Sequence, residues 1–395
     1  LSEAGILDYS NSEAVAWIKE KFRCLFAQGA AVIKADFGEG APPDAVYSSV
    51  KGEAMHNLFP LLYNQAVFEA TEEHYGKGQG VIWARSAWAG SQRYPLHWSG
   101  DGIARYEDLA CVLRSALSFG LSGFPFYSHD VGGFSGIPSP ELYARWIQFG
   151  AFSSHVRCHG QPPREPWEYG GEVEGIFKKF MELRYRLLPY ILTEARDCGR
   201  TSLPMLRALA LEFQEDASTF GIEDEYLFGS SILVAPILDE TGRRRVYLPA
   251  GAWVEYWGKQ IFQGPRWIDV EAPLDRIPLF VRAGAVIPYG PLVQYVGEKV
   301  CDPLTLELYQ PTGESQHQFE LGGGQSVEVQ LRSGASRLEV ALGSTPGAVE
   351  LVVYGHKVRK ADREGTSLAV SQREDGAWVI PFAGRPGGRV IMELD

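Results

Sequence analysis

Hydrophobic residues follow two different patterns in the two halves of the chain. Through roughly the first 225 residues, short continuous apolar runs alternate with longer stretches in which apolar residues return every three or four positions. The longer period indicates amphipathic helices, and the short apolar runs indicate strands that are buried on both faces. This alternation predicts strand–helix units with parallel strands, either in a doubly wound sheet or in a barrel.

The first predicted helix shows how these elements are delimited. It opens on the capping candidates Ser10 to Ser12, its apolar residues recur at helical spacing, and Gly29 ends it. We expect further helices over 53–75, 107–119, 140–154 and 172–198. Buried strands are expected over 30–36, 80–86 and 122–130.

After about residue 225 the pattern changes to short strands separated by glycine and proline turns, as in “RRVYLPAG”, “SVEVQL” and “VELVVYG”. Such spacing is typical of all-β sandwiches. The predicted fold class is therefore α/β followed by all-β, with an α/β domain at 1–225 and two β-sandwich domains at 226–297 and 298–395.

Composition and charge narrow the possible partners. The net charge is −12, from 37 basic and 49 acidic residues, which argues against nucleic acid as a partner. The sequence contains no apolar run long enough for a membrane span and no signal-like start, so we expect no membrane partner. Five scattered cysteines without CxxC spacing are typical of reduced thiols in a cytoplasmic protein.

Charged and polar residues cluster where the predicted parallel strands end. In a (β/α)8 barrel these ends converge on the face that carries the chemistry. Any one of these residues alone could be an ordinary strand-end or helix-start residue, but successive units repeat the pattern. The residues are Asp36, Arg85, Asp101, His129 with Asp130, and His159.

Two carboxylates from different strands predict paired acid and nucleophile chemistry, for which glycoside hydrolysis is the standard use. Lys34 lies two positions before Asp36 and therefore shares its strand face, where it would keep Asp36 ionised or form a structural ion pair. Glu39 is interpreted as structural. We expect neither a metal nor another cofactor, because the pair His155 and His159 has no evident third ligand.

Several segments carry a resemblance to a known family. “KADFGE”, “ARSAWAGSQRYPLHWSGD”, “SFGLSGFPFYSHDVGGF” and “SSHVRCHG” resemble the α-xylosidase-like branch of glycoside hydrolase family 31, and “LFGSSILVAPIL” resembles its C-terminal sandwich. The resemblance implies that residues 1–225 are the C-terminal part of a TIM barrel, about strands 4–8. It implies that Asp36 is the catalytic nucleophile and Asp101 the general acid/base.

The same resemblance assigns the sugar-binding residues. Arg85 and His159 would contact sugar hydroxyls, and Lys34, Trp98 and Phe134 would line the subsite where cleavage occurs. Asp130 would be a supporting carboxylate behind it.

The implied function is a retaining α-glycosidase that acts on a small oligosaccharide or other α-glycoside. An α-xylosidase that releases α-linked xylose from non-reducing ends is the first interpretation, and an α-glucosidase or α-transglycosylase is the alternative. A non-catalytic carbohydrate-binding subunit is the alternative from another class. The family's N-terminal sandwich and first barrel strands are not recognised in this sequence, so we expect them on another chain, with a homo-oligomer also left open.

Overall fold

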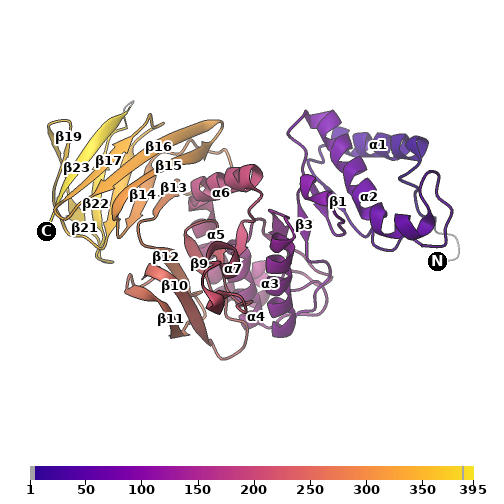
Figure 1. The fold of residues 1–395 in the computed structure, drawn as a ribbon, viewed down its shortest axis with the longest axis horizontal. Coiled ribbons are helices and arrows are strands. Elements are labelled where there is room, and N and C mark those ends of the chain that lie inside the picture. Colours follow the sequence, from indigo (N-terminus) through magenta and orange to yellow (C-terminus); the bar gives the residue numbers. More distant parts are fainter. Residues whose placement is uncertain (1–4, 385–386) are drawn as a thin grey trace.

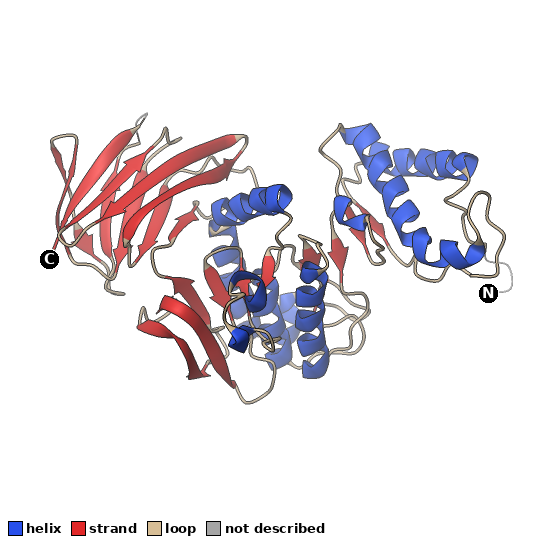
Figure 2. Ribbon diagram, viewed as in Figure 1, coloured by secondary structure: helices blue, strands red, loops and turns tan. Residues whose placement is uncertain are grey.

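The computed structural model describes residues 5–384 and 387–395, with helices in the N-terminal and middle parts and strands towards the C-terminus (Figure 1, Figure 2). The α-helices are α1 (Ser12–Ala27), α2 (Gly52–Tyr75), α3 (Tyr106–Leu121), α4 (Pro140–Ala151), α5 (Gly171–Arg186), α6 (Leu188–Thr201) and α7 (Leu209–Glu212). The parallel strands between them are β1 (Ile33–Ala35), β2 (Ile82–Ala84), β3 (His97–Trp98), β4 (Tyr127–Ser128), β5 (Asp130–Val131) and β6 (Arg157–Cys158).

Local capping explains where helices begin. The side chain of Asn11 accepts hydrogen bonds from the backbone N–H groups of Glu13 and Ala14, which fixes the start of α1. Ser139 caps α4 in the same way, and Pro140 at its first position needs no hydrogen-bond acceptor there. These caps lie where the sequence pattern placed helix starts.

The long helix predicted over 172–198 is two helices in the structure. α5 ends at Arg186, and α6 begins at Leu188 with Pro189 in its first turn. Proline has no N–H to donate to the preceding turn, and its ring crowds the carbonyl there, so a continuous helix is interrupted at this point. The break lets α6 turn towards the C-terminal sheets (Figure 1).

The parallel strands form one four-stranded sheet in the order β1-β2-β3-β4 and one pair, β5-β6. Lys34 is opposite Trp83, and Asp130 is opposite Arg157. The strand expected over 122–130 is limited to β4 and, after a break at His129, β5. Because every strand runs the same way, their carboxyl ends meet at one edge, as in a (β/α) barrel.

The first strands lie in a separate N-terminal lobe. β1, α1 and α2 stand away from α3–α6, and β3 lies between the two groups (Figure 1). The apolar core of this lobe is small and centres on Ala35, Val67, Ile82 and Tyr94. The largest core instead joins α3–α6 to the following sheet. Within the described residues β1 hydrogen-bonds to a neighbouring strand only on the β2 side.

The following β-sheet covers the helices of the α/β part. Its strands are β7 (Leu206–Ala208), β8 (Tyr226–Phe228), β9 (Ile232–Val234), β10 (Arg243–Glu255), β11 (Ile261–Glu271) and β12 (Leu279–Arg282), hydrogen-bonded in the order β11-β10-β12-β9-β8-β7. Tyr226 and Phe228 belong to the core shared with the helices, whereas Leu227 belongs to a second core with Trp253 and Phe280. β8, in the interior of the sheet, is therefore buried on both faces.

The C-terminal part is a two-sheet sandwich. One sheet contains β13 (Val286–Tyr289), β14 (Leu304–Tyr309), β18 (Val349–Tyr354), β21 (Ser371–Gln372) and β22 (Trp378–Phe382). The other contains β15 (Gly313–Gly322), β16 (Gln325–Ser333), β17 (Arg337–Leu342), β19 (Val358–Arg363), β20 (Thr366–Leu368) and β23 (Gly388–Leu394). A single apolar core draws residues from both sheets. β13, which lies before the expected boundary at 297, pairs with β14 in this sandwich.

A lysine joins the two C-terminal units. The ammonium group of Lys259, in the turn between β10 and β11, lies 4.5 Å from the ring centre of Tyr256, 5.4 Å from that of Tyr309 and 4.4 Å from that of Tyr354. Tyr309 and Tyr354 belong to the sandwich. The cation–π contacts therefore connect the sandwich to the preceding sheet.

None of the helices within the described residues combines the length and the apolar character that a membrane crossing requires.

Candidate active site

The predicted site residues meet at the carboxyl edge of the parallel strands. Lys34 and Trp98 lie on β1 and β3, and Asp130 lies on β5. Asp36, Arg85 and His159 directly follow strand ends, and Asp101 and Phe134 lie three residues after one. The structure thus brings into one site Lys34, Asp36, Arg85, Trp98, Asp101, Asp130 and His159.

Arg85 contacts both carboxylates for which we predicted catalytic roles. Its Nη1 lies 3.1 Å from Oδ1 of Asp36 and 3.5 Å from Oδ2 of Asp101. These two oxygens are therefore no farther apart than the sum of the distances, about 6.6 Å. The two carboxylates, which come from different strands, face one narrow gap.

The surroundings of Asp36 favour its ionised form. Lys34 Nζ donates to Oδ2 of Asp36 at 2.8 Å, and the backbone N–H of Phe37 donates to Oδ1 at 2.9 Å. Burial on its own raises the pKa of Asp36, but these hydrogen bonds and the charges of Lys34 and Arg85 outweigh it, so the pKa lies below its usual value. Asp36 is therefore a carboxylate at neutral pH.

The loop after β1 is shaped around Arg85. Phe37 adopts a left-handed φ of 59°, and its ring lies 4.1 Å from the guanidinium carbon of Arg85. Ser86 donates a hydrogen bond to the Phe37 carbonyl at 2.7 Å, and Gly38 has a φ of 99°. Glu39, which we interpreted as structural, forms an ion pair with Nη2 of Arg85. The loop thereby fixes which nitrogen of Arg85 points at the carboxylate pair.

A second charged cluster lies behind this pair. Asp130 is only 2% exposed, and both Nε and Nη2 of Arg157 donate to its Oδ1. The guanidinium carbon of Arg157 lies 5.3 Å from the ring centre of Trp83 and 5.1 Å from that of Trp98. Lys34 Nζ lies 4.8 Å from the Trp98 ring centre, so this cluster is continuous with the surroundings of Asp36.

Burial and charge oppose each other at Asp130. Burial raises the pKa of Asp130, and the charges of Arg157, His159 and Lys34 counteract it. Burial also lowers the pKa of His159, which the nearby Asp130 opposes. Oδ2 of Asp130 has no hydrogen-bond partner among the described residues, so an acceptor remains free in the site.

A glycine-rich loop presents Phe134 beside His159. The two ring centres are 5.5 Å apart. The Phe134 N–H donates to the Gly102 carbonyl at 2.8 Å, which ties this loop to the segment that carries Asp101. Arg164 is buried and donates two hydrogen bonds to the Gly133 carbonyl, which hold this loop in place.

Sequence reasoning missed Arg157 and Trp83. A signal was present for Arg157, since it precedes His159 by two positions and alternate residues of a strand share a face. Trp83 likewise precedes Arg85 by two positions. Their contact with each other depends on how two separate sheets lie in the folded chain, which no local pattern reveals.

Two other histidines that drew attention lie outside this arrangement. His129 is buried with its ring stacked on Phe149, and its Nδ1 accepts a hydrogen bond from Trp146. His155 packs against the edge of Trp83. Among the residues that the structure describes, no three His, Cys, Asp or Glu side chains are grouped as metal ligands would be.

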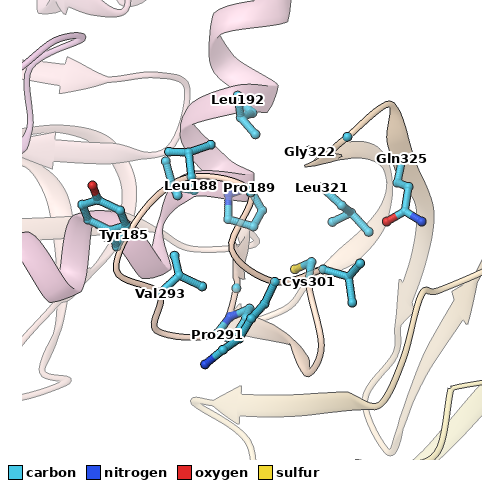
Figure 3. A pocket seen from close by; sticks show the side chains of 16 residues that line it. Tyr185, Leu188, Pro189, Leu192, Pro291, Val293, Cys301, Leu321, Gly322 and Gln325 are labelled. Carbon is cyan, nitrogen blue, oxygen red and sulfur yellow. The ribbon is translucent and has the colours of Figure 1, made fainter.

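Two cavities differ in their relation to the site. One of about 330 Å³ is bounded by Asp36, Glu39 and the aromatic residues Tyr9, Phe59 and Tyr63. Another of about 310 Å³ lies between α6, the loop after β13 and the β15–β16 hairpin (Figure 3), and its wall is largely apolar, with Leu188 and Leu321 among its residues. Of these two cavities, the first is lined by one residue of the carboxylate pair, Asp36, and the second by neither.

Comparisons with known proteins add family relationships to this geometry. The profile of the glycosyl hydrolases family 31 TIM-barrel domain matches residues 2–194, and that of the glycosyl hydrolase family 31 C-terminal domain matches residues 202–287. An alpha-xylosidase of Emericella nidulans is 37% identical over 295 residues, which are 72% of this chain and 38% of the relative. The chain thus spans well under half the length of this relative.

Two further relatives have activities other than that of an alpha-xylosidase. The alpha-glucosidase 2 of Bacillus thermoamyloliquefaciens is 33% identical over 263 residues, 66% of this chain and 33% of the relative. The structure of a family 31 dextranase of Flavobacterium johnsoniae, complexed with isomaltotriose, superposes with a TM-score of 0.90 at 25% identity. That superposition covers 98% of this chain and 56% of the dextranase.

Proposed function

We propose, because the chain belongs to glycoside hydrolase family 31, that it carries both catalytic carboxylates of a retaining α-glycosidase. The observation that supports this most directly is the contact of one Arg85 nitrogen with both Asp36 and Asp101. Two carboxylates from different strands then share one gap, which is the arrangement that glycoside hydrolysis requires.

The spacing favours retention over inversion. Carboxyl groups are roughly 5–5.5 Å apart in retaining glycosidases and roughly 6.5–9.5 Å apart in inverting ones, where a water lies between them. The two oxygens that contact Arg85 are at most about 6.6 Å apart, which accommodates the shorter separation of retaining glycosidases. We therefore assign direct attack on the sugar to one of the two carboxylates.

Asp36 is the nucleophile in this proposal, because its contacts with Lys34 and the Phe37 N–H keep it ionised. In the first step an Asp36 oxygen bonds to the anomeric carbon as the glycosidic bond breaks. Asp101 gives its proton to the leaving oxygen. In the second step Asp101 takes a proton from water, the water oxygen bonds to the anomeric carbon, and the bond to Asp36 breaks. Two inversions return the α configuration.

The remaining predicted residues bind the sugar in this proposal. Arg85 and His159 contact hydroxyl groups, while Lys34, Trp98 and Phe134 line the subsite around them. The ring pair of Phe134 and His159 supplies apolar faces of the kind that pack against sugar rings. The Trp98 ring is buried against Lys34 and Arg157 and supports the subsite from behind.

Asp130 supports this subsite from behind through its pairing with Arg157. Its Oδ2 is buried and has no hydrogen-bond partner among the described residues.

The first substrate that we propose is an α-xyloside. Support comes from the “KADFGE” motif and from the 37% identity to an alpha-xylosidase, compared with 33% to an alpha-glucosidase. An α-glucosidase or an α-transglycosylase remains the alternative within the family. A non-catalytic carbohydrate-binding subunit is less favoured, because Asp36 and Asp101 are both present and a chain without turnover has no need of the pair.

Parallel assays on 4-nitrophenyl α-xyloside and α-glucoside with the complete enzyme test the substrate. We expect a higher kcat/KM on the xyloside, and proton NMR of the first product should show the α anomer. A β anomer would contradict retention, and a preference for the glucoside would select the alternative. No turnover on either substrate, with sugar binding preserved, would favour the binding subunit.

The nucleophile is tested by Asp36→Ala. We expect kcat to fall at least about a thousandfold, because the covalent step loses its attacking atom. Added azide should restore part of the rate and give a β-glycosyl azide, since a small anion fills the space of the lost carboxylate. Asp44→Ala, at an acidic residue outside the site, is the matched control. Near-normal activity of Asp36→Ala would overturn the assignment.

A further inference from the structure

We propose that Arg157 is a positioning residue of this site: it is held by Asp130, it packs against the rings of Trp83 and Trp98, and it thereby fixes the ring beside which Lys34 contacts Asp36. The inference rests on the proposed function only in its kinetic consequence. The geometric relay from Arg157 to Asp36 is independent of which sugar is bound.

The first step of this relay is the attachment of Arg157. β5 and β6 pair in parallel with Asp130 opposite Arg157, so the two side chains leave neighbouring strands at the same level. Two nitrogens of Arg157 donate to one oxygen of Asp130, and the Asp130 side chain is almost entirely buried. A guanidinium fork held in this way has little freedom to rotate.

The second step is the fixing of the two indole rings. Trp83 comes from β2 and Trp98 from β3, and Arg157 lies within cation–π distance of both. Both indole N–H groups are buried without a hydrogen-bond partner among the described residues. The rings are therefore held by packing and by the guanidinium group. Without a hydrogen bond to fix each indole N–H, the positions of the rings depend more strongly on Arg157.

The third step connects the Trp98 ring to Asp36. Lys34 Nζ lies 4.8 Å from the Trp98 ring centre and donates to Asp36 at 2.8 Å. The other charged or titratable groups that face Asp36 are Arg85, Asp101 across the gap and, from α2, Tyr63. A shift of the Trp98 ring would move the ammonium group of Lys34 and leave these other groups in place.

A lysine at position 157 would not reproduce this arrangement. An ammonium group is a compact charge on a flexible stem, and it lacks the planar fork that both donates twice to Asp130 and stacks on two rings. Arg157→Lys therefore keeps the charge and removes the geometry. The substitution separates a positioning role from a simple need for positive charge.

The experiment compares Arg157→Lys with Arg145→Lys in the complete enzyme. Arg145 is also buried, but it donates to the carbonyls of Ala272, Pro273 and Arg276, away from the carboxylate pair. The carboxyl pKa of Asp36 is followed by ¹³C NMR of protein labelled at the aspartate carboxyl carbons, with Asp36→Asn for assignment. Thermal unfolding and the kinetics on nitrophenyl α-glycosides are measured in parallel.

For Arg157→Lys we expect the Asp36 pKa to rise by about one pH unit and kcat to fall about 10- to 100-fold, with KM changed less than about threefold. Arg145→Lys should lower the unfolding temperature and leave the Asp36 pKa unchanged. If Arg157→Lys changes only the unfolding temperature, as Arg145→Lys does, then Arg157 is merely structural and the proposal is overturned.

A double variant covers the case in which Arg157→Lys does not fold. Asp130→Asn with Arg157→Met removes both buried charges together, so neither is left uncompensated. It should fold and show the same rise of the Asp36 pKa, and an unchanged pKa would overturn the proposal. If the parent enzyme hydrolyses no α-glycoside, the proposed function fails, but the titration of Asp36 still decides the role of Arg157.

Discussion

At the scale of single residues, the site is an arrangement of opposing charges. Asp36 is ionised because Lys34, Arg85 and a backbone N–H act on one carboxylate. At Asp130 the balance is reversed, because burial raises the pKa above its usual value and the charge of Arg157 offsets only part of that rise. Each acid nevertheless has a neighbouring cation that can be replaced individually.

Lys34→Met tests this dependence through pH. The variant loses a hydrogen bond and a positive charge beside Asp36, so the Asp36 pKa should rise by about one unit. The acid limb of kcat/KM, which reports the free enzyme, should move to higher pH by the same amount. Lys178→Met, at an exposed lysine on α5, is the control, and an acid limb that stays in place in Lys34→Met would refute the assignment.

The ion pair of Lys34 and Asp36 also affects the stability of the folded protein. Because the pKa of Asp36 is lower in the folded protein than its usual value, its stabilising contribution is present above about pH 4 and is lost as pH falls through the lowered value. Lys34→Met should therefore reduce stability at neutral pH and make little difference in acid. Denaturant unfolding at several pH values measures this.

At the scale of elements, the loop after β1 depends on one glycine. Gly38 has a φ of 99°, and a Cβ atom added there would lie 2.4 Å from Oγ of Ser86. Gly40, two residues later, has an ordinary φ and no atom within 4 Å of an added Cβ. The two glycines make a matched pair within one loop.

Gly38→Ala should lower the free energy of unfolding by about 1–2 kcal/mol, because it combines a left-handed backbone with a steric clash. Gly40→Ala should change it by less than about 0.5 kcal/mol. Urea denaturation compares the two. Adding Ser86→Ala to Gly38→Ala should recover only part of the loss, since the backbone strain remains. Equal effects at positions 38 and 40 would contradict this account.

Elements with strong local signals were predictable from the sequence, and those set by distant pairing were not. The helices α2 and α4 begin within one residue of the predicted starts because capping and apolar spacing are local. The break at Leu187 was missed although Pro189 signalled it. The position of β13 was not predictable, because a short apolar strand carries no information about which sheet it joins.

The contacts within the site also fall into those that the sequence predicted and those that it did not. Asp36 and Asp101 were expected to meet because each follows a parallel strand, and the structure brings both to Arg85. Their chemical roles stay a prediction. The contact of Arg157 with Trp83 and Trp98 brings β6 of the two-stranded sheet against β2 and β3 of the four-stranded sheet, an arrangement that only the folded chain provides.

At the scale of the whole molecule, the β-sheets behind the α/β part are joined by specific contacts. Lys259 crosses from the β10–β11 turn to the rings of Tyr309 and Tyr354. Burial lowers the pKa of Lys259, which Glu307 and Asp375 oppose. The cost of desolvating this ammonium group is offset by the aromatic rings and these carboxylates.

Lys259→Met should weaken the attachment of the C-terminal sandwich. We expect a loss of about 1–2 kcal/mol, visible in calorimetry as a lower or separated transition of the sandwich. Lys360→Met, at an exposed position of β19, should leave the transition unchanged. A calorimetric trace of Lys259→Met identical to that of the parent would show that the contacts of Lys259 with the tyrosine rings contribute nothing to the attachment of the sandwich.

The position of Arg85 has a consequence for inhibition. One guanidinium nitrogen of Arg85 contacts both Asp36 and Asp101, so two acidic side chains share a single positive charge. A protonated imino sugar would bring a further positive charge beside the ionised Asp36, whereas a neutral sugar lactone of equal shape would not. Binding of such amines should weaken as salt is added and as pH rises above the pKa of the amine.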